Sequence, residues 1–244
     1  MRVLEATDVS VRFGGITALD GASLAVEPGG ITGLIGPNGA GKTTMFDVLT
    51  GLTPVDSGRV VVDGRNVTRV APHRRARLGV ARTFQRLELF GGLTVLENVE
   101  CAAGMALGAR GRAAAARRIA GPLVARVGLG PVAHVRAGLL PTGQARLVEV
   151  ARALATHPKV LLLDEPASGQ SDTEREQFAR LLRELAQDGL GILLVEHDMD
   201  LVMSVCEYLV VLNFGRVIAA GSPADVRRDP SVMSAYLGSG APHG

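Results

Sequence analysis

The stretch GPNGAGKTT, residues 36–44, constrains the fold of this chain more than any other part of the sequence. It fits the pattern GxxxxGK[ST] with Gly36, Gly41, Lys42 and Thr43, between the apolar run ITGLI and the helix-compatible run TTMFDVLTG. Glycines let the backbone turn so that successive N–H groups point inward, and the N-terminus of the following helix adds its dipole. The sequence therefore predicts a strand, a phosphate-binding loop and a helix in direct succession.

The same loop carries side chains that can hold the phosphates of a nucleotide and a magnesium ion. Lys42 is one of only two lysines in the chain, and it is placed to neutralise the β and γ phosphates. The hydroxyl of Thr43 is placed to coordinate magnesium. The candidate phosphate site consists of Gly36, Pro37, Asn38, Gly39, Ala40, Gly41, Lys42, Thr43 and Thr44.

A second candidate site follows the apolar run at residues 160–163, where Asp164 and Glu165 stand side by side at the end of a predicted strand. Asp164 can hold the magnesium shell, and Glu165 then points at the in-line water as the candidate general base. A GTPase would need the guanine-selecting sequence NKxD, which this chain lacks. The acidic pair therefore favours a nucleotide hydrolase other than a GTPase.

Strand-like runs alternate with helical patterns along the chain. Phe178, Leu181 and Leu185 recur with the period of a helix that buries one stripe. The nearly continuous apolar runs at residues 160–163 and 192–195 suit parallel strands covered on both faces. These patterns predict an α/β fold. The strand-like runs lie at residues 3–13, 31–36, 58–64, 159–165, 191–197 and 207–221.

Composition limits the functions open to the chain. With 47% apolar residues, 244 residues can bury a substantial core. A net charge of +2 and 3% aromatic residues do not favour a nucleic-acid partner. The arginines at residues 71–82 and 109–118 are therefore interpreted as surface charges. Cys101 and Cys206 lie far apart without metal-ligand spacing, and we expect free thiols in a reducing compartment.

No secretory signal is recognised, and no apolar run approaches the ~20 residues of a membrane helix. If a membrane is involved, we expect the chain to bind to a protein within it.

The motifs together resemble those of the nucleotide-binding subunit of an ABC transporter, and the resemblance covers almost the whole chain. They occur in the order of that family: an aromatic residue, the Walker A loop, a Q-loop glutamine, the signature, Walker B, the D-loop and the switch histidine. In this sequence they are VRF ending at Phe13, GPNGAGKTT, ARTFQ ending at Gln85, LLPTGQ at residues 139–144, LLLDEP at 161–166, SGQSD at 168–172 and LLVEHD with His197.

The resemblance implies a role for each motif. Phe13 would stack on adenine, Gln85 would touch the magnesium or water shell, and His197 would donate to the γ-phosphate and steady the attacking water. Backbone amides at the start of the helix after the signature would bind the phosphates of a second subunit's nucleotide. These amides lie around Thr142, Gly143 and Gln144. Two subunits would then clamp two ATP molecules head to tail.

The resemblance also implies a P-loop (RecA-like) core with an antiparallel β subdomain and an inserted α-helical subdomain. We expect a single ABC ATPase domain at residues 1–238, followed by a flexible tail at 239–244. Within this domain, the nucleotide-binding core would take residues 1–86 and 152–222. The helical subdomain with the signature would take 87–151, and a C-terminal helix would take 223–238.

Several stretches are most similar to the ATPases of branched-chain amino-acid uptake systems, including GVARTFQ, VEHDMDLVM and DPSVMSAYLG. The similarity implies a peripheral subunit on the cytoplasmic face of the cell membrane, bound to membrane permease subunits and to a second ATP-binding subunit, identical or not. A periplasmic or extracellular solute-binding protein would take part indirectly. ATPases for urea, amide or lipopolysaccharide transport share much of this pattern, so the cargo stays open.

Two motifs depart from the family's pattern. In the signature, Pro141 stands where serine is usual, which removes a hydroxyl and a backbone donor, and Thr142 is a candidate substitute. In the D-loop, Gln170 and Ser171 replace leucine and an acid, and Asp172 comes one residue late. Because of these departures, an alternative function remains: a clamp subunit that binds nucleotide but hydrolyses it slowly. A soluble ABC ATPase of DNA repair or translation is a further alternative, although such proteins usually carry a coiled-coil insertion or a second cassette.

Overall fold

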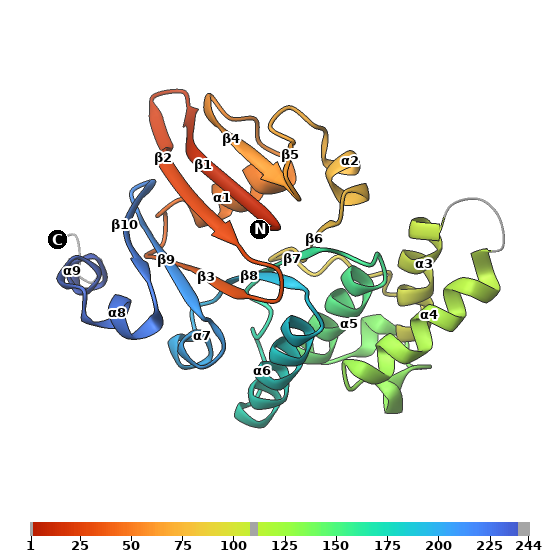
Figure 1. Cartoon of the computed structure of the whole chain (residues 1–244). Helices are drawn as coiled ribbons and strands as arrows, with labels where there is room; N and C mark the ends of the chain where they lie inside the picture. The colour runs from red at the N-terminus through yellow and green to blue at the C-terminus, as the bar shows by residue number, and fades with distance from the viewer. Residues whose placement is uncertain (1, 108–111, 239–244) are drawn as a thin grey trace.

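The computed structural model describes residues 2–107 and 112–238, which form two sheets with helices around them (Figure 1). The larger sheet has the strand order β10-β9-β3-β8-β7-β6, and its neighbouring strands are parallel except for β9 and β10. Its strands are β3 (Ile31–Ile35), β6 (Val80–Arg82), β7 (Val160–Asp164), β8 (Gly191–Val195), β9 (Tyr208–Asn213) and β10 (Arg216–Gly221). The predicted α/β class is confirmed.

The smaller sheet is antiparallel, with the order β2-β1-β4-β5. Its strands are β1 (Leu4–Phe13), β2 (Ile16–Val26), β4 (Ser57–Val62) and β5 (Arg65–Asn66). Helix α1 (Lys42–Thr50) lies between the two sheets (Figure 1). The β subdomain expected from the resemblance is therefore present.

The larger sheet is covered on both faces, which explains its nearly continuous apolar strands. On β7, Val160 and Leu162 belong to the core that contains α1 and the antiparallel sheet. Leu161 and Leu163 belong to the opposite core, which contains α6 (Asp172–Gln187) and α7 (Met199–Val205). Because successive side chains of a strand point to opposite faces, one short apolar run serves both cores.

The described part of residues 87–151 has no strand, apart from an isolated bridge between Thr94 and Arg136. It contains α3 (Val95–Leu107), α4 (Arg112–Arg126) and most of α5 (Thr142–Leu154), which lie at the β6 side of the larger sheet (Figure 1). Helix α5 continues past the boundary expected at residue 151 and packs in one core with α6. The exact division into subdomains stays a prediction. The short helix α2 (Pro72–Arg77) precedes β6.

The strand-like run at residues 207–221 is a hairpin of β9 and β10 rather than a single strand. The chain turns at Phe214 and Gly215, whose φ angles are +45° and +78°. A Cβ atom at Gly215 would lie 2.7 Å from the carbonyl oxygen of Ala18 on β2. The turn therefore packs closely on the antiparallel sheet, a long-range contact that periodicity does not reveal. Strand β2 itself was also missed.

The prediction of one C-terminal helix at residues 223–238 was wrong. Two short helices, α8 (Pro223–Arg228) and α9 (Pro230–Gly238), are separated by Asp229. Asp229 has φ −71° and ψ 120°, because a residue that precedes a proline is disfavoured in the helical region. The tail predicted at residues 239–244 lies outside the described residues.

Candidate nucleotide-binding site

The predicted phosphate loop connects β3 to α1. Gly41 is the N-cap of α1, with φ +107°; it makes no side-chain capping bond, and the first turn of α1 contains no acid. A Cβ atom at Gly36 would lie 2.1 Å from the carbonyl oxygen of Leu212, and one at Gly41 would lie 2.6 Å from that of Ala18. The loop therefore requires glycine at both positions, and it leaves the first amides of α1 without a competing side-chain acceptor.

Lys42 is folded over this loop. Its side-chain Nζ donates to the carbonyl oxygens of Gly36, at 2.6 Å, and Pro37, at 2.9 Å. Burial lowers the pKa of the Lys42 ammonium, while the charges of Glu165 and Asp164 oppose that shift. The loop amides, the dipole of α1 and this ammonium form a donor set suited to phosphate oxygens.

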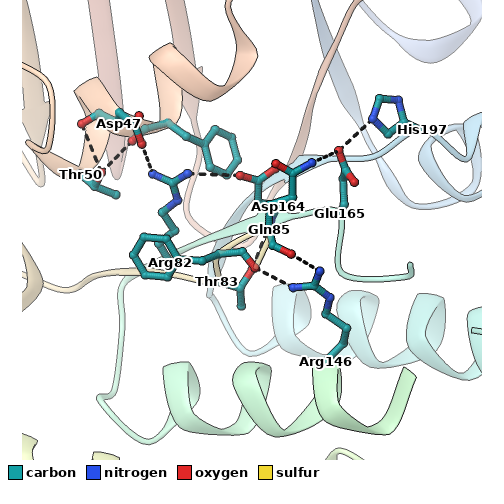
Figure 2. A network of polar contacts seen from close by, with 11 residues as sticks. Asp47, Thr50, Arg82, Thr83, Gln85, Arg146, Asp164, Glu165 and His197 are labelled. Carbon is teal, nitrogen blue, oxygen red and sulfur yellow. Dashed lines mark hydrogen bonds and ion pairs between the residues drawn. The ribbon is translucent and has the colours of Figure 1, made fainter. Parts of the chain in front are cut away.

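The catalytic candidates meet at the carboxyl ends of β7 and β8. The Glu165 carboxylate oxygen Oε1 lies 2.9 Å from Nε2 of His197 and accepts a hydrogen bond of 3.3 Å from Nε2 of Gln85 (Figure 2). The backbone of Glu165 has φ +49°, and its N–H donates to the carbonyl oxygen of Val195. A left-handed conformation is uncommon for a residue with a side chain. Here it ends β7 and turns the carboxylate toward the neighbouring strand end.

A groove joins these residues to the phosphate loop. It is lined by Ile16, Thr17, Ala18, Asn38, Gly39, Ala40, Gly41, Lys42, Thr43, Thr44, Gln85, Asp164, Glu165, Val195 and His197. Within the described residues, no group of three or more His, Cys, Asp or Glu side chains could hold a metal on its own. Thr43, Asp164 and Gln85 offer oxygens for magnesium, which typically takes one or two protein oxygens together with substrate phosphates. All three side chains line the same groove as the phosphate loop, so their oxygens lie beside the candidate phosphate site.

Some predicted residues lie outside this groove. Phe13, at the end of β1, is 54% exposed and is not among the lining residues. Ile16, Thr17 and Ala18 of β2 line the groove instead. The predicted stacking of Phe13 on adenine stays a prediction.

The signature residues also lie outside the groove. Helix α5 begins at Thr142, and its N-cap Pro141 makes no side-chain capping bond. A Cβ atom at Gly143 would lie 3.1 Å from Cγ of Gln170. The signature therefore rests on the D-loop of its own chain.

The unusual D-loop sequence has a structural effect. Ser171 is the N-cap of α6 and forms a capping box with Glu174, whose Oε2 accepts from the backbone N–H of Ser171 at 2.8 Å. Asp172 is exposed in the first turn of α6 and forms an ion pair with Arg175. Arg175 also donates a hydrogen bond of 2.6 Å to Oδ2 of Asp198, the residue that follows His197 in the sequence. Arg175 therefore links Asp172 of the D-loop to Asp198, next to His197, within one chain.

The interpretation of the arginines at residues 71–82 as surface charges was wrong for Arg75, which is buried, and for Arg82, the last residue of β6, whose side chain is 7% exposed. The Arg82 side chain forms ion pairs with Asp47 of α1 and with Asp164 of β7, the latter at 3.2 Å. Burial raises the pKa of Asp164, while the charge and hydrogen bond of Arg82 lower it, and Glu165 and Asp47 add to the rise. The chain contains so many arginines that residue type alone does not distinguish Arg82. Its position three residues before Gln85 is the one sequence feature that places it near the site.

Two further buried charges were missed. Arg146 of α5 donates to the backbone carbonyl oxygens of Phe84, at 2.6 Å, and Gln85. Glu196 accepts from the backbone N–H of Ala167 at 2.7 Å and from that of His197 at 3.1 Å. Burial is the main cause that raises the pKa of Glu196. Both residues bind main-chain groups, and Arg146 also forms an ion pair of 3.1 Å with Glu149 on its own helix. No sequence pattern marks the main-chain contacts.

Comparison with known proteins identifies the family of this chain. A family model described as ABC transporter matches residues 19–168. The chain belongs to the ABC transporter family. A second model, described as branched-chain amino acid ATP-binding cassette transporter, matches residues 216–242. Membership in the ABC family confirms the resemblance drawn from the motifs.

Full-length relatives of this ABC chain include transport ATP-binding proteins. It is 38% identical to the high-affinity branched-chain amino acid transport ATP-binding protein BraF of Pseudomonas aeruginosa, over 97% of this chain and 98% of BraF. It is 34% identical to the lipopolysaccharide export system ATP-binding protein LptB of Escherichia coli, over 98% of each chain.

Solved ABC cassettes share the fold. The ADP conformation of MJ1267 has a TM-score of 0.86 at 31% identity, covering 98% of this chain and 99% of that one. A dimeric post-hydrolysis state of MJ0796, bound to ADP and Pi, has a TM-score of 0.81 at 25% identity, covering 90% of this chain and 98% of that one. None of the described helices of this ABC chain combines the length and apolarity needed to cross a membrane.

Proposed function

We propose that this ABC protein binds magnesium-ATP, hydrolyses it, and couples the reaction to solute import, with branched-chain or related amino acids as the cargo. The observation that carries the catalytic part is the single groove in which Lys42, Asp164, Glu165 and His197 meet. The similarity to BraF over nearly the full chain supports the cargo.

Each residue has a distinct role in this proposal. The loop amides and Lys42 hold the phosphates, and Glu165 accepts the proton of the attacking water. His197 and Gln85, both in contact with Glu165, orient the carboxylate and the water. Magnesium, held by Thr43 and Asp164 with Gln85 nearby, would neutralise charge on the phosphates.

Two partner surfaces belong to the proposal. An apolar groove lies beside the Q-loop, between α2, β6 and α5, and it includes the exposed side chains of Leu52, Phe84 and Met105. Exposed apolar patches of this kind mark protein contacts, and we assign this one to a membrane permease. The protein would thus be peripheral, on the cytoplasmic face of the membrane.

The second surface is the amino end of α5, whose amides lie outside the chain's own nucleotide groove and lack a side-chain cap. These amides around Thr142, Gly143 and Gln144 would complete the nucleotide site of a second ATP-binding subunit.

Two alternatives have specific support. The similarity to LptB favours lipopolysaccharide as a possible cargo class, although the model that matches residues 216–242 favours amino acids. Pro141 and Gln170 favour a clamp that hydrolyses slowly. Turnover of the assembled transporter separates this clamp from an active ATPase, and uptake of labelled leucine into vesicles that contain the permeases tests the cargo.

The catalytic proposal is tested with Glu165→Gln, which keeps the shape of the side chain but removes the base. Hydrolysis by the assembled complex should fall roughly 100-fold or more while ATP still binds. Lys42→Ala should abolish tight ATP binding in a nucleotide titration, because the cation of the phosphate loop is lost. Glu176→Gln, an exposed change on α6, serves as the matched control. Near wild-type turnover of Glu165→Gln would assign the base elsewhere.

A further inference from the structure

One guanidinium is shared between two carboxylates from different elements beside the nucleotide groove. Arg82 lies between Asp47 of α1 and Asp164 of β7, and its Nη1 and Nη2 atoms each contact one acid (Figure 2). Asp164 lines the groove, whereas Asp47 does not. The only described side-chain link between Asp47 and the candidate metal ligand Asp164 therefore passes through Arg82.

The surroundings hold this guanidinium in place. The side chains of Arg82 and Asp164 are each 7% exposed, and that of Asp47 is 30% exposed. The ring centroids of Phe46 and Phe84 lie 5.4 and 4.9 Å from the guanidinium carbon. Buried charges in contact interact more strongly than exposed ones. Removal of one acid should therefore change how strongly Arg82 binds the other.

The backbone around Asp164 is held independently of Asp47. The N–H of Asp164 donates to the hydroxyl of Thr83 at 3.2 Å, and the N–H of Thr83 donates to the carbonyl oxygen of Leu162 at 2.9 Å. Arg82 pairs with Leu162 in the parallel ladder of β6 and β7. An isosteric change at Asp47 should alter the distribution of charge around Arg82 without moving the end of β7.

We propose that Asp47 is a positioning residue for the metal site: by sharing Arg82, it weakens the hold of the guanidinium on Asp164 and leaves that carboxylate available to magnesium. This inference rests on the proposed function, in which Asp164 is a metal ligand. Without the Asp47 charge, the Arg82 guanidinium forms an ion pair with Asp164 alone. A metal ion must then compete with an undivided guanidinium for the same carboxylate.

The test measures Mn²⁺ binding to the full-length, ADP-bound protein by electron paramagnetic resonance, together with ADP affinity in the absence of metal. Asp47→Asn should weaken Mn²⁺ binding roughly 3- to 10-fold without changing metal-free ADP affinity. Asp63→Asn removes an acid that pairs with Lys159 outside the groove, and it should leave both values unchanged. Unchanged Mn²⁺ binding in Asp47→Asn overturns the inference.

A double-mutant cycle separates action through Arg82 from a direct effect of the Asp47 charge. In an Arg82→Gln background, Asp47→Asn should no longer weaken Mn²⁺ binding, and a retained effect overturns the role of Arg82. If Arg82→Gln does not fold, Arg82→Lys replaces it, because one ammonium lacks the fork that contacts both acids. The effect of Asp47→Asn should then shrink, and an undiminished effect again overturns the role of Arg82.

Asp164→Asn distinguishes this inference from the proposed function. If Asp164→Asn leaves Mn²⁺ binding unchanged, the assignment of Asp164 as a metal ligand is wrong, and the inference falls with it. If Asp164→Asn weakens Mn²⁺ binding while Asp47→Asn does not, only the inference is overturned.

Discussion

The two cysteines show how burial changes the chemistry of a single residue type. Cys101 on α3 is exposed, whereas Cys206, after α7, is buried. Burial raises the pKa of the Cys206 thiol to about 12, with a further contribution from the charge of Glu207. Because the thiolate is the reactive form, Cys206 should be inert near neutral pH.

We expect iodoacetamide at pH 8 to modify only Cys101 in the native protein and both cysteines after unfolding, as read by mass spectrometry. In Cys101→Ser, native labelling should disappear. Equal labelling rates for the two thiols in the folded wild-type protein would contradict the burial of Cys206.

At the scale of elements, helix α5 holds the Q-loop segment through its main chain. Arg146 donates to the carbonyl oxygens of Phe84 and Gln85, and Glu149 accepts from the N–H of Glu88 at 2.9 Å. Arg152 donates to the carbonyl oxygen of Glu88. The helix that begins at the signature therefore also sets the position of the glutamine that contacts Glu165.

We predict that Arg146→Met lowers kcat for ATP hydrolysis by on the order of 10- to 100-fold, with a smaller change in KM, because Gln85 loses its support. Steady-state kinetics of the assembled complex test this prediction, with Arg180→Met on the exposed face of α6 as the control. Arg146→Met should also lower the melting temperature, since Glu149 loses its buried partner. If Arg146→Met lowers the melting temperature but leaves kcat unchanged, Arg146 supports the fold and does not position Gln85 for catalysis.

At the scale of the whole molecule, the nucleotide site of one chain is incomplete if the signature serves a second subunit. Pro141 is the N-cap of α5 and offers no hydroxyl. In Pro141→Ser, the hydroxyl oxygen could accept from the first turn of α5 while its O–H donates to the partner's γ-phosphate.

Pro141→Ser should therefore strengthen ATP-dependent dimerisation roughly 10-fold or more in a Glu165→Gln background, where slow hydrolysis keeps the clamp closed. Sedimentation with and without ATP measures the change. If Pro141→Ser has no effect while Thr142→Ala abolishes dimerisation, Thr142 already supplies the contact.

The fold class and the candidate residues of the nucleotide site could be predicted from local sequence patterns. Glycine spacing before Lys42 requires a tight loop at a helix start, and apolar runs that end in Asp164 and at His197 require buried strands that deliver polar residues to one sheet edge. Each of these features involves residues that are close together in the sequence, so the sequence pattern is enough to predict it. The order of the motifs was sufficient to identify the family, which the comparisons confirm.

Contacts between residues far apart in the sequence became visible in the folded structure alone. The turn at Gly215, the division of Arg82 between Asp47 and Asp164, and the clamp of Arg146 on the Q-loop backbone each join residues far apart in the chain. The charges of Arg82 and Arg146 interact strongly because they are buried, and their burial depends on how the sheets and helices pack around them. Periodicity and motif spacing describe one element at a time, so they could not predict these contacts.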